Sequence, residues 1–136
     1  MPHDVLMNKA AIIERTIQRV QEEYRNAGDN FAKDYTRQDA AILNIQRACE
    51  AALDMGQYII ARDKLGLAQS ARDVFQILAN KQKITQDLAQ SLQKMVGFRN
   101  IAVHEYQQIL LPIVEKIITE HLQDLLQLSQ VLLQEK

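Results

Sequence analysis

The chain has 136 residues, of which 47% are apolar and 24% are charged, and its formal net charge is −1. This apolar content excludes intrinsic disorder, and the charge excludes a general electrostatic attraction to nucleic acid. Glycine and proline are scarce, which is typical of an all-helical protein. We expect a single helical domain over residues 1–136.

The rest of the composition limits compartment and cofactors. One cysteine, Cys49, rules out an internal disulfide and favours a reducing compartment. The N-terminal residues do not resemble a signal peptide, and no run of eighteen apolar residues occurs, so we expect a cytoplasmic protein that does not bind membranes. No two of the histidines His3, His104 and His121 lie three or four residues apart. We therefore expect no metal site and no cofactor.

Two long helices are predicted in the first half of the chain. Apolar residues recur in steps of three and four from Leu6 to Tyr24, which predicts a helix from about Asp4 to Ala27. The sequence "GDN" at 28–30 breaks this helix. A second apolar stripe runs from Ile42 to Ile59.

The second helix has small residues in the middle of its apolar face: Ala48, Ala51, Ala52 and Gly56. A glycine inside a helix costs about 1 kcal/mol relative to alanine, so we expect another helix to pack very close there. Cys49 lies among these residues and is expected to serve packing. Gly66 is expected to cap the end of this helix.

Two serine or threonine caps begin the next helices. The Ser70 side chain is expected to accept a hydrogen bond from the Asp73 amide and to start a short helix through about Asn80. Thr85 repeats this pattern before a fourth helix, which is expected to end near Asn100.

The last helix is expected to start at Pro112, because proline suits the first turn of a helix. Its apolar residues cover more of the helix surface than one core-facing stripe needs. We expect this surface to meet both its own bundle and a second subunit. The sequence therefore predicts an up-and-down bundle of about five helices that forms a homodimer.

Polar residues gather in the stretch "RNIAVHEY", which contains Arg99, Asn100, His104 and Tyr106. In a continuous helix Arg99 and His104 would point about 140° apart. We therefore expect the chain to leave the helix after Asn100 in an extended path, with His104 and Tyr106 facing one side.

These residue types suit cleavage of a phosphodiester without metal. Histidine can take a proton from a ribose 2′-hydroxyl or give one to the leaving oxygen. Arginine can neutralise the charge that the phosphate gains in the transition state. A two-fold dimer would bring two Arg–His sets together, so that one histidine could act as the base and the other as the acid.

Structural roles are open for the same residues. Arg99 could satisfy carbonyls at a helix end, Asn100 could cap the helix, and His104 could be a half-buried histidine with a hydrogen-bond partner. Tyr106 could pack at the start of the last helix. His121 falls on the apolar stripe of that helix and is expected to be a core or interface histidine.

The segment from Ser70 to Ile109 resembles the HEPN superfamily, and in particular the HepT toxins that pair with a minimal nucleotidyltransferase antitoxin. The motif that carries this resemblance is arginine, four residues, histidine, one residue and tyrosine, at Arg99, His104 and Tyr106. The flanking sequences "RACEA" at 47–51 and "KMVGFRN" at 94–100 extend it. The resemblance runs from about Thr36 onward and is weaker in the first helix.

The resemblance implies a metal-independent endoribonuclease that is the toxin of a type VII-like toxin–antitoxin system. It implies a helical-bundle homodimer whose two Arg–His motifs line a shared cleft, with RNA and not DNA as the substrate. Arg99 and His104 would be catalytic and Asn100 would support them. Tyr106 would be the residue to which the antitoxin transfers AMP, and toxin and antitoxin could form a larger complex.

The sequence after Arg99 departs from this expectation because it is acidic. The RNA-binding surface would then come from basic residues elsewhere, for which the candidates are Arg15, Arg19, Arg47, Arg72 and Lys94. Two other interpretations are open: a non-catalytic nucleotide- or partner-binding subunit of a nucleotidyltransferase complex, and a plain helical scaffold.

Overall fold

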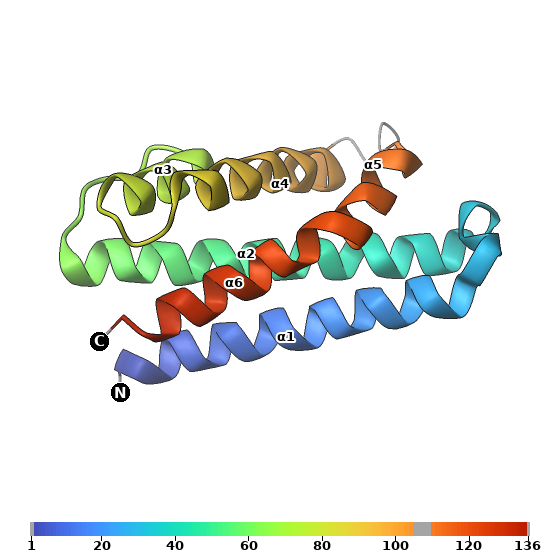
Figure 1. Ribbon diagram of the computed structural model, residues 1–136, viewed down its shortest axis with the longest axis horizontal. Coiled ribbons are helices and arrows are strands. Elements are labelled where there is room, and N and C mark those ends of the chain that lie inside the picture. Colours follow the sequence, from blue (N-terminus) through green and yellow to red (C-terminus); the bar gives the residue numbers. More distant parts are fainter. Residues whose placement is uncertain (1, 105–109, 136) are drawn as a thin grey trace.

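The computed structural model describes residues 2–104 and 110–135; at 2, 3, 103 and 104 it describes only the backbone. This part of the chain is an all-α bundle without strands, as predicted (Figure 1). Its elements are α1 (Pro2–Ala27), the 3₁₀ turn η1 (Gly28–Lys33), α2 (Tyr35–Asp63), α3 (Ala71–Asn80), α4 (Gln86–His104), α5 (Leu111–Lys116), the π-helical turn η3 (Ile117–His121) and α6 (Leu122–Leu133).

Helix α2 is the centre of the bundle. It packs along α1 and also contacts α3, α4 and α6 (Figure 1). The largest fully buried side chains come from every one of these helices and include Leu6, Ile45, Phe75, Leu92 and Leu125. No helix in the described ranges is long and apolar enough to cross a membrane.

Gly56 of α2 packs closely against another helix, α3, as the sequence predicted. A Cβ atom added to Gly56 would lie 2.6 Å from the Cγ1 atom of Val74 and 3.2 Å from the Cδ1 atom of Leu78. Real Cβ atoms essentially never come this close to another atom, so a larger residue would require Val74 or the two helices to shift. The cost of a mid-helix glycine is therefore offset by close packing.

Two of the three predicted caps are confirmed. The Ser70 Oγ atom accepts a hydrogen bond from the Asp73 amide at 3.2 Å, and the Thr85 Oγ1 atom accepts one from the Leu88 amide at 3.1 Å. The prediction that Gly66 caps α2 is wrong. Lys64 takes the left-handed conformation with φ 54°, and the next amide donates to the Ile60 carbonyl at 3.0 Å, so the helix is closed before Gly66.

The predicted end of the fourth helix is also wrong. Helix α4 does not end near Asn100 but continues to His104, so the residues directly after Asn100 are helical and not extended. Gly97 does not interrupt α4, and the buried stripe continues past it to Ala102, which is 7% exposed. Burial of Ala102 supports helical backbone where a break was expected.

The last helical segment begins with Pro112 in its first turn, as predicted, but η3 divides it. Its wide apolar surface is mostly buried within its own chain, because α6 contacts α1, α2 and α4. The buried apolar residues of this segment are Val114, Ile117, Ile118, Leu122, Leu125, Leu128 and Leu132. This surface alone therefore does not require a second subunit, and the homodimer stays a prediction.

Candidate active site

Arg99 lies on the buried face of α4, in the same stripe as Leu92, Met95 and Ala102. Its side chain is 18% exposed, and its Nη1 atom lies 3.1 Å from the Oε1 atom of Glu50 on α2. The Nε atom of Arg99 is buried and has no hydrogen-bond partner among the described residues. The guanidinium thus keeps a donor that this part of the chain does not use.

The other residues of the predicted motif are described less completely. Asn100 is exposed and lies inside α4, so it is not a C-cap. His104 is the last residue of α4, five residues after Arg99, which corresponds to about 7.5 Å along the helix and a turn of about 140° around it. The His104 side chain and the whole of Tyr106 lie outside the described residues.

Cys49 lies next to Glu50 and is buried, as predicted. Burial raises the pKa of its thiol to about 12, although the positive charge of Arg99 acts in the opposite direction. A thiol with this pKa is protonated at neutral pH and is therefore a poor nucleophile. Cys49 is a packing residue beneath the Arg99–Glu50 pair and not a second reactive group.

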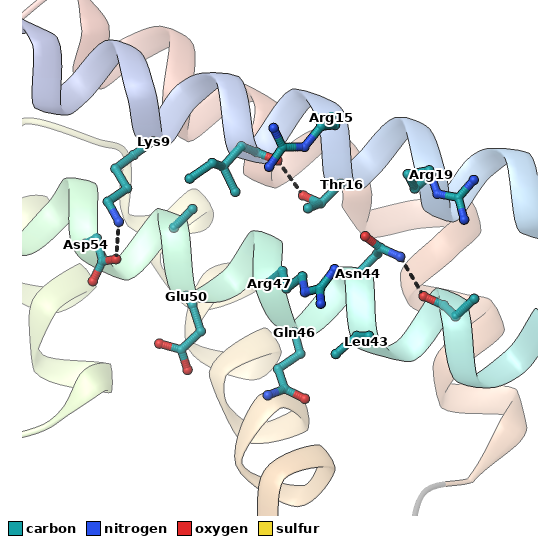
Figure 2. Close-up of a pocket in the computed structure, with 13 residues that line it drawn as sticks. Lys9, Arg15, Thr16, Arg19, Leu43, Asn44, Gln46, Arg47, Glu50 and Asp54 are labelled. Carbon is teal, nitrogen blue, oxygen red and sulfur yellow. Dashed lines mark hydrogen bonds and ion pairs between the residues drawn. The ribbon is translucent and has the colours of Figure 1, made fainter.

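Three of the five candidate RNA-binding residues meet at one groove. This α1–α2 groove is lined by α1 from Lys9 to Arg19 and by α2 from Ala40 to Asp54, and its volume is about 700 Å³. Figure 2 shows Arg15 and Arg19 on α1 facing Arg47 on α2 across it, with Glu50 farther along α2. Glu50, which pairs with Arg99, therefore belongs to the same groove as these three arginines.

The other two candidates, Arg72 and Lys94, lie elsewhere. They line a separate pocket of about 400 Å³ beside α4, together with the exposed apolar residues Ile101, Leu110 and Ile113. They do not contribute to the α1–α2 groove.

His121 ends the π-helical turn, and its side chain is 27% exposed. Its Nδ1 atom lies 3.1 Å from the Oδ2 atom of Asp124, so it is a half-buried histidine with a polar partner and not a fully buried core residue. Within residues 2–104 and 110–135, no group of three His, Cys, Asp or Glu side chains is arranged to hold a metal ion.

Sequence reasoning missed Glu50 as a partner of the candidate site. The available signal was a single acidic residue between Cys49 and two alanines of the buried α2 stripe. A charge in that position is expected to find a partner, but sequence spacing alone does not identify an arginine on another helix.

The described part of the chain is a helical bundle whose fourth helix contains Arg99 and His104, two residues of the motif on which the resemblance to the HEPN superfamily rests. The family model described as ribonuclease HepT-like matches residues 13–132, and the chain belongs to that family. The resemblance noted in the sequence is therefore confirmed, and the chain is a member of a ribonuclease family.

Known relatives agree with this assignment. The mRNA nuclease HepT of Shewanella oneidensis is 46% identical over 130 residues, which cover 96% of this chain and 97% of that protein. A structure of the tri-AMPylated HEPN toxin of Shewanella oneidensis in complex with its MNT antitoxin is similar with a TM-score of 0.89 and 46% identity, covering 94% of this chain and 96% of that one. A toxin–antitoxin crystal structure with AMP-PNP has a TM-score of 0.89 and 45% identity, covering 95% and 98%.

Proposed function

We propose that this chain is a metal-independent endoribonuclease and the toxin of a toxin–antitoxin pair, with Arg99 and His104 as catalytic residues and Asn100 as a supporting residue. The observation that carries the proposal is the half-buried Arg99, whose guanidinium keeps an unused donor five residues before His104. The HepT-like family and the relative named mRNA nuclease support the same activity.

The proposed reaction is an internal transesterification of RNA. A histidine takes the proton of the ribose 2′-hydroxyl, and the oxygen attacks the adjacent phosphorus. The bond from phosphorus to the 5′-oxygen then breaks, and a second acid protonates that oxygen. The products are a 2′,3′-cyclic phosphate and a free 5′-hydroxyl. Arg99 neutralises charge on the phosphate oxygens as the transition state forms.

The two proton transfers favour a homodimer, because one His104 cannot conveniently be base and acid in a single step. An exposed apolar patch supports this part of the proposal. Ile101, Leu110 and Ile113 are 37%, 61% and 46% exposed, and all three line the pocket beside the last turns of α4. Exposed apolar side chains that gather in this way are typical of a protein interface.

The test compares wild type with Arg99→Ala and His104→Ala in growth and in cleavage of purified RNA. We expect wild type to arrest growth and to cleave RNA in the presence of EDTA, and each variant to lose at least about 100-fold in cleavage rate. Arg25→Ala is the matched control, because Arg25 is exposed on α1. Equal cleavage by all four proteins would overturn the catalytic assignment, and inhibition by EDTA would overturn metal independence.

We further propose that a minimal nucleotidyltransferase antitoxin silences the toxin by transferring AMP to Tyr106. The AMPylated relative in complex with an MNT antitoxin supports this proposal. Each AMP adds a phosphate, whose negative charge would repel RNA and compete with it for the Arg99 guanidinium.

Mass spectrometry after co-expression with the antitoxin tests the modification. We expect one or more AMP units on wild type and none on Tyr106→Phe. Tyr35→Phe is the matched control, because Tyr35 is 73% exposed and would be modified if exposure alone were sufficient. Modification of Tyr106→Phe at the wild-type level would exclude Tyr106.

A further inference from the structure

The α1–α2 groove is rich in basic residues, and Glu50, the ion-pair partner of Arg99, is part of its wall. We propose that this groove binds the phosphate backbone of single-stranded RNA and leads it to Arg99. The proposal rests on the ribonuclease function above and assigns the surface that holds the substrate.

The charges in the groove are not balanced. Lys9 is neutralised by Asp54 at 2.9 Å, and Arg19 interacts with Glu22 and Glu23 on its own helix. Arg15 and Arg47 are different, because both are exposed and neither forms an ion pair with a described residue.

Figure 2 shows that Arg15 and Arg47 come from opposite walls of the groove. In a chain with 17 acidic and 16 basic residues, two uncompensated arginines in one groove concentrate positive charge locally. This charge is the feature that attracts phosphates.

The floor of the groove is polar. Thr16 and Asn44 are 3% and 7% exposed, and both donate hydrogen bonds to carbonyls of the preceding helical turn, at 2.7 Å and 2.8 Å. Ile12, Leu43 and two alanines add apolar surface to the lining, so it is the excess of arginine that favours a nucleic acid over a partner helix. Along α2 the lining extends from Ala40 to Asp54, about 21 Å of helix, which suits an extended ligand.

Glu50 is the residue that joins the groove to the proposed catalytic Arg99. It lines the groove, and its Oε1 atom lies 3.1 Å from the Nη1 atom of Arg99. Arg47 and Glu50 are about one helical turn apart on α2, so a phosphate held at Arg47 lies about one turn from the residue that pairs with Arg99. This continuity favours RNA as the occupant over an acidic surface of the antitoxin, which has no need to reach Arg99.

Binding of 2′-O-methyl RNA tests the proposal independently of catalysis, because this RNA lacks the attacking hydroxyl. Fluorescence anisotropy with an unstructured oligomer of about 30 nucleotides gives the dissociation constant at several salt concentrations. We expect the double variant Arg15→Gln, Arg47→Gln to bind about 20-fold more weakly at 0.1 M salt. The slope of log K against log salt should fall by about 1.4, since each single-strand phosphate contact contributes about 0.7.

Two matched double variants complete the design. Arg15→Lys with Arg47→Lys keeps both charges and should keep the salt slope. Arg25→Gln with Lys81→Gln removes two exposed basic residues outside the groove and should leave the slope unchanged. Circular dichroism confirms that all variants are folded.

Three results would show that the groove does not hold the RNA. The proposal is overturned if wild type does not bind the RNA, if both glutamine double variants lose affinity equally, or if Arg15→Gln with Arg47→Gln impairs antitoxin binding but not RNA binding. Failure of the ribonuclease proposal looks different: wild type would bind 2′-O-methyl RNA through the groove and yet leave unmodified RNA intact.

Discussion

The Nη1 atom of Arg99 lies 3.1 Å from the Oε1 atom of Glu50, and this ion pair joins α4 to α2 at the wall of the α1–α2 groove. The two partners differ in exposure, because the Arg99 side chain is 18% exposed and the Glu50 side chain is 48% exposed. Glu50 can therefore do two things: its oxygen holds the guanidinium in place, and its negative charge competes with an incoming phosphate.

Substitutions at Glu50 separate these two effects. Glu50→Gln keeps an oxygen that can accept from Arg99 but removes the charge, so we expect the KM for RNA to fall by up to about 5-fold with little change in kcat. Glu50→Ala removes the acceptor as well, and we expect kcat to fall by about 10-fold because the guanidinium is no longer oriented. Steady-state cleavage of one RNA gives both constants. If glutamine and alanine reduce kcat equally, the charge of Glu50 is what positions Arg99.

The two helical glycines should respond in opposite ways to alanine. At Gly56 the added Cβ meets Val74 at 2.6 Å, so Gly56→Ala should lower the free energy of unfolding by about 1–3 kcal/mol through overpacking. At Gly97 nothing lies within 4 Å of the added Cβ, so Gly97→Ala should raise it by about 0.5–1 kcal/mol. Urea denaturation measures both. A Gly56→Ala protein as stable as wild type would mean that α2 and α3 separate without cost.

Much of the fold follows from local patterns in the sequence. The apolar period of α1 and α2, the Ser70 and Thr85 caps and the small stripe around Gly56 all predicted what the structure contains. Each of these features depends on residues within a few positions of one another, or on one face of one helix. That is the information which a single sequence carries best.

The geometry of the candidate site was harder to predict, because it depends on tertiary contacts. Gly97 suggested that the helix loosens and ends near Asn100. In the structure α4 continues to His104, and Ala102 in this extension is buried. The pairing of Arg99 with Glu50 joins residues 49 positions apart on different helices, and no local pattern identifies it. The motif therefore predicted Arg99 as a candidate site residue, whereas only the folded structure shows that Glu50 is its ion-pair partner.

The ion pairs at the end of α2 should stabilise the fold in a pH-dependent way. A hydrogen bond from Arg62 is the main factor that holds the pKa of Asp63 below its ordinary value of 3.8, and Lys83 adds to this effect. A carboxyl with a lowered pKa contributes stability above its unfolded pKa and loses it as the pH falls through the folded pKa. The contribution should therefore be present at pH 7 and should decrease as the pH falls below about 4.

Asp63→Asn tests this contribution. Because these side chains are about one quarter exposed, we expect the variant to be less stable than wild type by at most about 1 kcal/mol at pH 7, and the difference to shrink near pH 3. Denaturant titration at both pH values measures it. Asp29→Asn is the control, since Asp29 is exposed and forms no ion pair with a described residue. A difference that grows at low pH would contradict the assigned sign.

The thiol of Cys49 should be protected in the native protein. Its pKa of about 12, against an ordinary value of 9.0, reduces the thiolate fraction by about 1000-fold at pH 8, and burial also blocks the reagent. A group whose pKa is raised by folding contributes stability below its unfolded pKa. This stability should therefore decrease as the pH rises from about 9 toward 12.

Labelling with a disulfide reagent at pH 8 measures the protection. We expect native protein to react only as fast as it unfolds, and urea-unfolded protein to react at once. An exposed control is provided by Ala11→Cys in a Cys49→Ala background, because residue 11 lies on the outer face of α1. If native Cys49 reacts as fast as this control, the thiol is accessible and α2 does not bury it beneath the Arg99–Glu50 pair.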